Sequence, residues 1–241
     1  MSSMYKEPVY WDNRYEAERA VPGGYDWFGT YRDFAELVRR EIRPGTRGLV
    51  LGCGNSSLSV DLHKEGVSPV VSIDYSPVCI TEMARKHAGI PDMRWLVMDA
   101  RQLTFPDGSF DLVIEKGTLD AMMVGERDPW RVSPDTISLV DQVLSEVSRV
   151  LSPTGCFISI TFSAPHFRTR HYAQPAYGWS VSCDTYGRDF HYFLYTMRKG
   201  RELTTFDLER GRSLHAPPIL PETLPTLAEN DDEEFLKNIQ I

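Results

Sequence analysis

Cysteine is scarce and widely spaced in this sequence. The four cysteines are Cys53, Cys79, Cys156 and Cys183, and no two of them form a close Cys-x-x-Cys pair. This spacing does not match the usual zinc sites, and four thiols in 241 residues are too few for a disulfide scaffold. The histidines show no ligand spacing either. We therefore expect reduced, mostly buried thiols and no metal site.

Long apolar runs and targeting signals are absent as well. The longest apolar stretches, residues 48–53 and 156–162, are far shorter than the roughly 18 residues of a membrane span. Residues 1–7 lack the apolar region of a secretory signal and the arginines of a transit peptide. We expect no membrane association and a cytoplasmic location.

The sequence has fewer basic than acidic residues. The chain has 26 Lys and Arg against 34 Asp and Glu, which gives a formal net charge of −8. This balance argues against a function in which nucleic-acid phosphates supply most of the affinity, although it leaves room for a local basic patch. Apolar residues make up 41% and charged residues 25%, as in ordinary globular proteins. The length fits one large domain or two small ones.

Short strands and helices alternate along the chain. Strands are predicted at 48–51, 70–74, 93–98, 109–115 and 156–162, with a last strand at 190–197. Helices are predicted at 31–42, from the capping residues 55–57 to about residue 66, and at 77–88. A long helix with Val140, Val143, Leu144, Val147 and Leu151 on one face is predicted to end at Pro153 and Gly155. Because helices separate consecutive strands, the pattern indicates parallel βαβ units and an α/β fold.

Two segments fall outside this alternation. Residues 163–189 form a polar and aromatic stretch that is long enough to be a functional insertion. Its basic and aromatic residues could stack RNA bases or dock a protein substrate; they are Phe167, Arg168, Arg170, His171, Tyr172, Tyr177 and Trp179. From residue 201 onward the chain is acidic and contains several prolines, and we expect a loosely attached tail in which Phe235, Leu236 and Ile239 could dock as one helical turn.

A glycine motif follows the first predicted strand. Gly52 and Gly54 stand at the strand-to-helix turn, and Asp74 ends the next strand 20 residues after Gly54. In open α/β sheets such a carboxylate accepts hydrogen bonds from both ribose hydroxyls of a nucleotide. Ser57 replaces the third glycine of a dinucleotide fingerprint, so a cofactor with ribose and adenine but no pyrophosphate fits better. The alternative is a tight turn that binds nothing.

Another carboxylate ends the third strand. Asp99 could accept a hydrogen bond from an adenine amino group, or it could simply cap the loop that follows. These features resemble the class I, seven-strand S-adenosylmethionine-dependent methyltransferases over residues 30–200. The matching segments are 49–56 (LVLGCGNS), 73–76 (IDYS), 98–100 (MDA) and 105–113 (FPDGSFDLV). One departure is Val50, where many members have an acidic residue.

The resemblance implies a fold and a cofactor. The fold is a single Rossmann-like domain, with a mostly parallel, doubly wound sheet and an antiparallel last strand. The cofactor is S-adenosyl-L-methionine, with S-adenosyl-L-homocysteine as its product. We divide the chain into an N-terminal aromatic arm covering the cofactor site (1–30), the methyltransferase domain (31–200) and the acidic tail (201–241).

Further segments resemble the methyltransferase-like proteins that modify lysines of translation elongation factor 1-alpha. They are 10–15 (YWDNRY), 25–28 (YDWF), 115–121 (EKGTLDA) and 166–172 (HFRTRHY). This resemblance implies a protein-lysine N-methyltransferase whose partner is that factor. We also expect a monomer and, from the charge balance, no nucleic-acid partner. The implied activity stretch is Glu115, Lys116, Gly117, Thr118, Leu119 and Asp120. With Gly54 from the glycine motif, the expected cofactor-binding residues are Trp11, Tyr15, Trp27, Gly52, Gly54, Asp74, Tyr75, Asp99, Ala100 and Lys116.

Each of these candidates also has a simpler interpretation. Glu115 or Asp120 near the pocket mouth could orient an acceptor amine, but Asp120 could instead cap a helix. Lys116 could face the cofactor through its backbone or side chain, or point into water. The aromatic arm could cover the cofactor and attract its sulfonium, or it could be a packing strap. Alternative functions are methylation of a small molecule or RNA, and a cofactor-binding module without catalysis.

Overall fold

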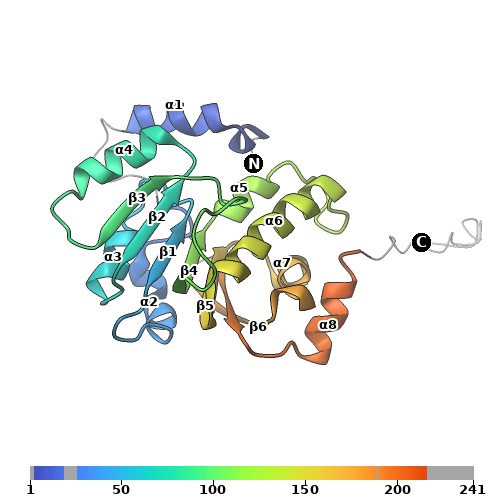
Figure 1. Ribbon diagram of the computed structural model, residues 1–241. Coiled ribbons are helices and arrows are strands. Elements are labelled where there is room, and N and C mark those ends of the chain that lie inside the picture. The colour runs from blue at the N-terminus through green and yellow to red at the C-terminus, as the bar shows by residue number, and fades with distance from the viewer. Residues whose placement is uncertain (1–2, 19–25, 189, 216–241) are drawn as a thin grey trace, which may run out of the picture.

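One seven-stranded sheet forms the centre of the protein. The computed structural model describes residues 3–18, 26–188 and 190–215. Within them the strand order is β3-β2-β1-β4-β5-β7-β6 (Figure 1). The strands are β1 (Gly48–Leu51), β2 (Val70–Asp74), β3 (Met93–Val97), β4 (Phe110–Lys116), β5 (Leu151–Thr161), β6 (Trp179–Tyr186) and β7 (Tyr192–Lys199). The first five are parallel, and β7 is antiparallel to both β5 and β6. The predicted α/β class, with an antiparallel last strand, is confirmed.

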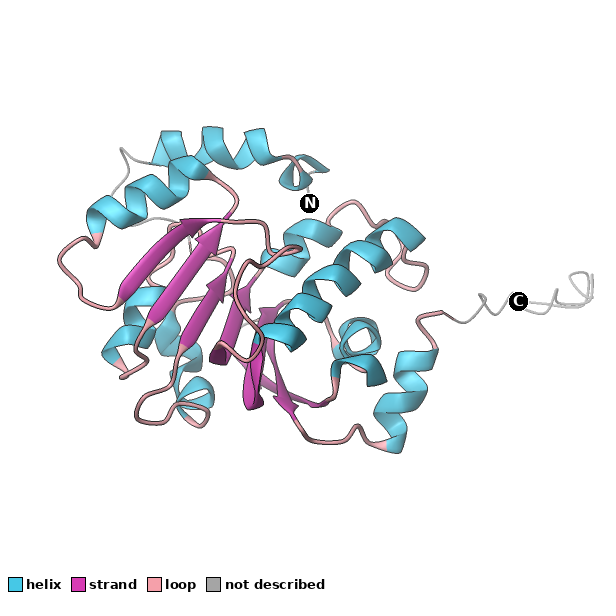
Figure 2. Cartoon of the chain, in the orientation of Figure 1, coloured by secondary structure: helices cyan, strands magenta, loops and turns pink. Residues whose placement is uncertain are grey.

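Helices cover both faces of the sheet, as the coloured elements of Figure 2 show. On one face lie α2 (Tyr31–Arg39), α3 (Leu58–Lys64) and α4 (Pro77–Lys86); on the other lie α5 (Thr118–Met123), α6 (Pro134–Val150) and α7 (Pro165–Tyr172). Alternate residues of a strand enter different cores: Val50 packs with the first set of helices, and Leu49 and Leu51 pack with the second. This alternation explains why β1 and the middle of β4, Leu112 to Ile114, carry apolar residues toward both faces. The arrangement is doubly wound, as expected.

The N-terminal segment lies across the carboxyl ends of the strands. It forms a 3₁₀ turn, η1 (Ser3–Lys6), and α1 (Pro8–Glu18), which contact α5 and α4 respectively (Figure 1). No helix was predicted here, because the aromatic and charged residues of α1 follow no helical period. No helix among the described residues has the length and apolar character needed to cross a membrane.

Within the stretch predicted as an insertion, the described residues 163–188 are part of the domain. They form α7, a 3₁₀ turn η2 (Pro175–Tyr177) and the unpredicted strand β6, which pairs with β7. Apart from the half-buried Phe167, the basic and aromatic residues singled out here are buried, with exposed fractions from 0% at Tyr172 to 8% at Arg170. Burial also lowers the pKa of His171 to about 3, which keeps this imidazole neutral. The expectation that this stretch as a whole forms a docking surface is wrong.

Two further boundaries differ from prediction. The long helix ends at Val150, and β5 begins at once, so Pro153 and Gly155 lie within the strand. The strand tolerates them because its register with β4 shifts between Phe110 and Leu112, which leaves this stretch out of the regular ladder.

The start of the predicted tail is also ordered. Residues Thr205–Arg212 form α8, which packs on α7. The Arg170 guanidinium donates to the Ser213 carbonyl at 2.7 Å, and a Cβ at Gly211 would lie 2.0 Å from the Ala173 carbonyl oxygen. The predicted loose attachment is therefore wrong for this helix. Its contacts with α7 are long-range, and local sequence does not reveal them. The remainder of the tail, 216–241, lies outside the described residues.

Candidate active site

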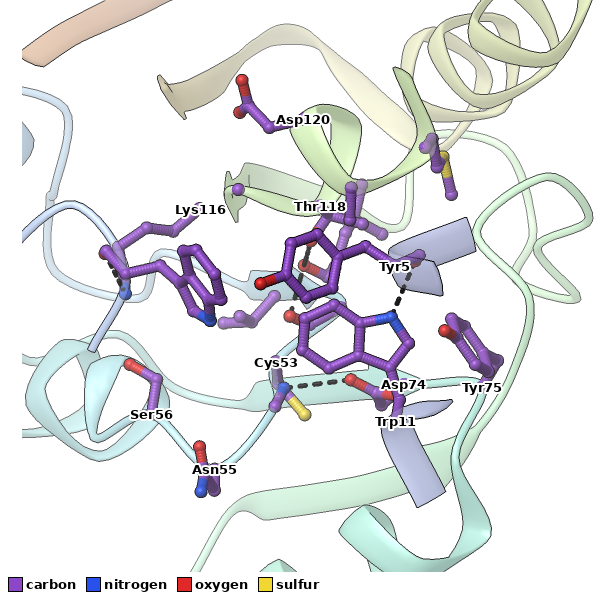
Figure 3. Close-up of a pocket in the computed structure, with 18 of the residues that line it drawn as sticks. Tyr5, Trp11, Cys53, Asn55, Ser56, Asp74, Tyr75, Lys116, Thr118 and Asp120 are labelled. Atoms are coloured by element: carbon purple, nitrogen blue, oxygen red, sulfur yellow. Dashed lines mark hydrogen bonds between the residues drawn. The ribbon is translucent and has the colours of Figure 1, made fainter. Parts of the chain in front are cut away.

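A cavity of about 500 Å³ lies at the carboxyl ends of β1, β2 and β4, beneath the N-terminal segment (Figure 3). These ends coincide because Leu51 pairs with Ile73 on one side and with Glu115 on the other. Of the expected cofactor-binding residues, the cavity is lined by Trp11, Tyr15, Trp27, Gly52, Gly54, Asp74, Tyr75, Asp99 and Lys116. Ala100 is buried next to Asp99 and does not line it.

The turn after β1 requires glycine. Gly52 has a φ of +58°, and a Cβ there would lie 2.2 Å from the Thr118 hydroxyl oxygen. That hydroxyl donates to the Leu51 carbonyl at 3.0 Å, so it cannot move aside freely. Gly54 also has a positive φ, of +51°. The backbone of this turn therefore lines the cavity directly, as a turn that receives a ligand must.

Asp74 links this turn to the end of β2. Its Oδ2 accepts from the Gly54 amide and its Oδ1 from the Ser76 amide, both at 3.0 Å. Burial raises the pKa of the Asp74 carboxyl, while these two hydrogen bonds oppose the rise. The carboxylate is thus fixed at the edge of the cavity, where a ribose would be recognised.

Asp99 is engaged with the loop that follows β3. Its carboxylate forms an ion pair with Arg101, at 2.5 Å, and accepts from the Arg101 amide at 2.9 Å. The Arg101 guanidinium lowers the pKa of Asp99. Both interpretations therefore apply to this residue, because it caps its loop and also lines the cavity.

Aromatic rings from the N-terminal segment close the cavity. The Trp11 indole donates to the Tyr5 carbonyl at 2.8 Å, and its ring centroid lies 5.8 Å from Tyr15 and 6.4 Å from Trp27. Tyr5, whose ring is 5.7 Å from Trp27, was not among the predicted residues. Its only sequence signal is that it is a further aromatic residue in the same arm.

Polar contacts hold this segment over the sheet. Asp12 accepts from the Ser76 hydroxyl, and Glu18 accepts from Nδ2 of the Asn55 side chain at 2.6 Å. Ser76 stands two residues after Asp74, and Asn55 stands directly after Gly54. The arm is therefore fastened to the two loops that form the floor of the cavity.

Lys116 fastens the other end of the arm and does not point into water. Its side chain is 6% exposed, and Nζ donates to the Trp27 carbonyl at 2.7 Å and to Asp26 at 3.1 Å. Burial lowers the pKa of Lys116, and the Asp26 carboxylate opposes that change. The residue lines the cavity while it holds Trp27 in place.

The predicted activity stretch divides into two groups. Lys116, Gly117, Thr118 and Asp120 line the cavity, whereas Glu115 and Leu119 are each 1% exposed and do not. Glu115 accepts from the Thr118 and Leu119 amides at the start of α5, and from the Ser159 hydroxyl. Its place at the pocket mouth is therefore a wrong prediction: the side chain turns inward to satisfy the free amides of α5, a helix whose N-cap is Gly117.

Asp120 lies in the first turn of α5 and is paired rather than acting as a cap. Its Oδ1 accepts from Thr161 and from Arg168, both at 2.6 Å. Its Oδ2 is buried and receives no hydrogen bond from a described residue. Neither Thr161 nor Arg168 was predicted to belong to the site, because they stand 41 and 48 residues away in sequence.

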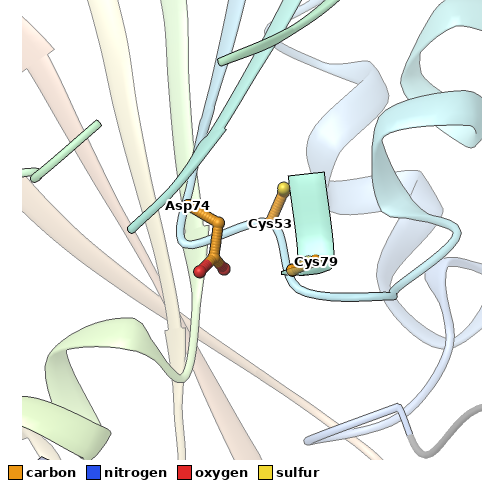
Figure 4. Close-up of side chains that lie close together, drawn as sticks. All are labelled: Cys53, Asp74 and Cys79. Carbon is orange, nitrogen blue, oxygen red and sulfur yellow. The ribbon is translucent and has the colours of Figure 1, made fainter. Parts of the chain in front are cut away.

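Cys53, Asp74 and Cys79 come together below the glycine turn, with their sulfur and oxygen atoms within 4.8 Å of one another (Figure 4). Burial raises the pKa of the Cys53 thiol well above its usual value, and metal ions bind the thiolate. Both Asp74 oxygens already accept backbone hydrogen bonds. We assign no metal ion to this group.

The site can be compared with known proteins. A family described as a methyltransferase domain matches residues 42–198. EEF1A lysine methyltransferase 4 of Bos taurus is 50% identical over 237 residues, which are 98% of this chain and 92% of that protein; the Mus musculus protein is 49% identical over the same shares. The eEF1A lysine and N-terminal methyltransferase of Homo sapiens is 35% identical over 71% of this chain and 24% of its own length.

Solved structures share the fold at low identity. The N-methyltransferase NodS from Bradyrhizobium japonicum, in complex with S-adenosyl-L-homocysteine, gives a TM-score of 0.61 at 16% identity, over 79% of this chain and 99% of that one. The magnesium protoporphyrin IX methyltransferase from Synechocystis, with bound S-adenosylmethionine, gives a TM-score of 0.58 at 17% identity. The match covers 83% of this chain and 98% of that one. From its sequence match to the relatives above, the chain belongs to the S-adenosylmethionine-dependent methyltransferases, and within them to the family of EEF1A lysine methyltransferase 4.

Proposed function

We propose that this methyltransferase modifies a lysine of translation elongation factor 1-alpha, as a cytoplasmic monomer. The observation that carries the proposal is the 50% identity to EEF1A lysine methyltransferase 4, which extends over 98% of the chain. The alternative of an RNA substrate rested on the basic and aromatic stretch of residues 163–189. It loses its support because all but Phe167 of the residues that suggested it are buried.

The cavity fits S-adenosylmethionine. When bound, this cofactor supplies a methyl group on a positively charged sulfur. The Gly52–Gly54 turn would receive it through the backbone, and the Asp74 carboxylate would accept from its ribose hydroxyls. The rings of Trp11 and Trp27 would attract its positive charge and keep water out.

The acceptor amine requires a second set of residues. A lysine ammonium must lose a proton to solvent before its nitrogen can attack, because only the neutral amine has a lone pair. With the cofactor bound, that lone pair would form the new N–C bond, and the C–S bond would break with its electron pair returning to sulfur. The cavity-lining Asp120 would bind the arriving ammonium and orient the amine in line with the methyl group.

Incubation of the purified protein with radiolabelled cofactor and purified elongation factor 1-alpha tests this proposal. We expect label on a lysine of the factor, and a loss of about 100-fold or more in turnover for Asp120→Asn with cofactor binding retained. Absence of label on every lysine of the factor would reject the substrate. A wild-type protein that binds cofactor but methylates nothing in a whole-cell extract would favour the non-catalytic module.

A further inference from the structure

Arg168 is an arginine buried beside the acceptor end of the cavity. It lies on α7, is 3% exposed, and donates from Nη2 to Asp120 Oδ1 at 2.6 Å and to the Thr161 hydroxyl at 3.2 Å. Its Nη1 lies 2.8 Å from the sulfur of Met123. Both Asp120 and Met123 belong to α5, so one guanidinium group holds this short helix from two sides.

The hydrogen bonds at Asp120 are distributed unequally between its two oxygens. Oδ1 receives both Thr161 and Arg168, whereas Oδ2 receives no described donor although the residue lines the cavity. Both hydrogen bonds to this carboxylate from described residues therefore converge on Oδ1, and they fix its orientation.

Glu115, the other buried carboxyl group next to Asp120, already has its donors. It accepts from the Thr118 and Leu119 amides and from the Ser159 hydroxyl. Among the described residues, Arg168 and Thr161 are therefore the groups that hold the Asp120 carboxylate in place.

We propose that Arg168 is a positioning residue for methyl transfer: with Thr161 it occupies Oδ1 of Asp120, and it thereby fixes the carboxyl group that would orient the acceptor lysine. This inference rests on the proposed function and assigns a role to the segment that the sequence marked as an insertion. Lysine could not replace Arg168, because a single ammonium cannot reach Asp120 and Met123 in the fixed fork geometry of a guanidinium.

The experiment is a double-mutant cycle between Arg168→Met and Asp120→Asn. If Arg168 acts through Asp120, we expect Arg168→Met to lower kcat about 100-fold in the wild-type background but less than about threefold in the Asp120→Asn background. KM for the elongation factor should change less than kcat, because most of a protein–protein contact lies outside this pair. Equal losses in the two backgrounds would overturn the inference.

Arg170→Met is the matched control. Arg170 is a buried arginine on the same helix, but it donates to the carbonyls of Trp130 and Ser213 and does not contact Asp120. We expect this variant to keep its kcat. If it loses as much kcat as Arg168→Met, the effect belongs to the packing of α7 in general and the inference is wrong.

Cofactor binding, measured by calorimetry, reports folding independently of turnover. Each variant should bind one equivalent of S-adenosylmethionine with nearly wild-type affinity. Should Arg168→Met fail to fold because it leaves Asp120 unpaired, Thr161→Val removes the other Oδ1 donor and keeps the charges; we expect about a tenfold loss of kcat, and an unchanged kcat would overturn the inference. A wild-type protein that labels no lysine of the factor rejects the proposed function itself, whereas an active wild type with an additive cycle rejects only the role of Arg168.

Discussion

The two ends of the cavity are built in different ways. The cofactor end joins residues that are close in sequence: Gly54 and Asp74 stand 20 residues apart and are linked by one βαβ unit. The acceptor end joins Asp120 to Thr161 and Arg168, which come from β5 and α7, 41 and 48 residues further along the chain. The cofactor end is therefore formed by one local βαβ unit of defined geometry. The acceptor end is formed by tertiary packing alone.

The two ends also differ in how they hold a buried carboxylate. Asp74 is stabilised by the neutral amides of Gly54 and Ser76, whereas Asp120 is stabilised by the full charge of Arg168. Backbone amides belong to the turn and stay when side chains change. A side-chain ion pair fails when either member is removed. We therefore expect cofactor binding to depend mainly on the single residue Asp74. Turnover at the acceptor end should depend on several residues that act together.

The largest effect is expected at the cofactor end, for Asp74→Ala. This change removes both ribose acceptors and releases the Gly54 amide, and we expect the Kd for S-adenosylmethionine to rise about 10³-fold, roughly 4 kcal/mol. Calorimetric titration measures it. Asp74→Asn keeps one acceptor oxygen, so it should lose less cofactor affinity than Asp74→Ala. A variant of Asp74 that binds the cofactor normally would mean that the ribose lies elsewhere.

This contrast also explains what could be predicted from the sequence. The bounds of β1 and β2 are as predicted, and the Gly52, Gly54 and Asp74 positions meet as expected, because each depends on local pattern and on one parallel crossover. Arg168 was noticed, but as part of a surface. The buried residues of α7 are largely polar and charged, so no apolar period shows which of its sides is inside.

The strand β6 was not predicted for a similar reason. The burial of β6 does not alternate regularly, and the strand exists because it pairs with β7. Sequence patterns report local preference, and they are silent where long-range pairing decides the conformation. Glu115 illustrates the same limit within the site: its residue type indicated chemistry, and only the start of α5 shows that it serves the helix instead.

The next largest effect concerns Glu115 and the pH dependence of stability. Burial, with the nearby charge of Asp120, raises the pKa of Glu115 to about 7 from its ordinary 4.5. The folded state therefore binds this proton more tightly than the unfolded state, and its stabilising contribution is complete below about pH 4.5 and lost as the pH rises through about 7. We expect the wild type to lose about 3 kcal/mol of unfolding free energy relative to Glu115→Gln across this window.

Urea unfolding of both proteins at several pH values measures this difference. Glu36→Gln is the control, because Glu36 is an exposed carboxylate whose side chain is 84% accessible, and it should follow the wild-type curve. Parallel curves for wild type and Glu115→Gln would show that Glu115 is ionised throughout and that the acceptor network carries more negative charge than we infer.

The smallest effect is expected for Tyr172→Phe, and it separates the two ends most cleanly. The Tyr172 hydroxyl lies 2.6 Å from the Ser159 hydroxyl, which donates to Glu115, so Tyr172 must donate to Ser159. Phenylalanine keeps the ring packing and removes only this hydrogen bond. We expect a loss of about 1 kcal/mol in the free energy of unfolding.

Cofactor affinity should not change in Tyr172→Phe, because Tyr172 is fully buried behind β5 and does not line the cavity. Unfolding and calorimetric titration of the same preparation give both quantities. If the cofactor affinity fell together with stability, the buried network would extend to the cofactor end, and the two ends would have to be treated as one unit. If stability alone falls, the network is confined to the acceptor end, where it supports α5 and so the orientation of Asp120.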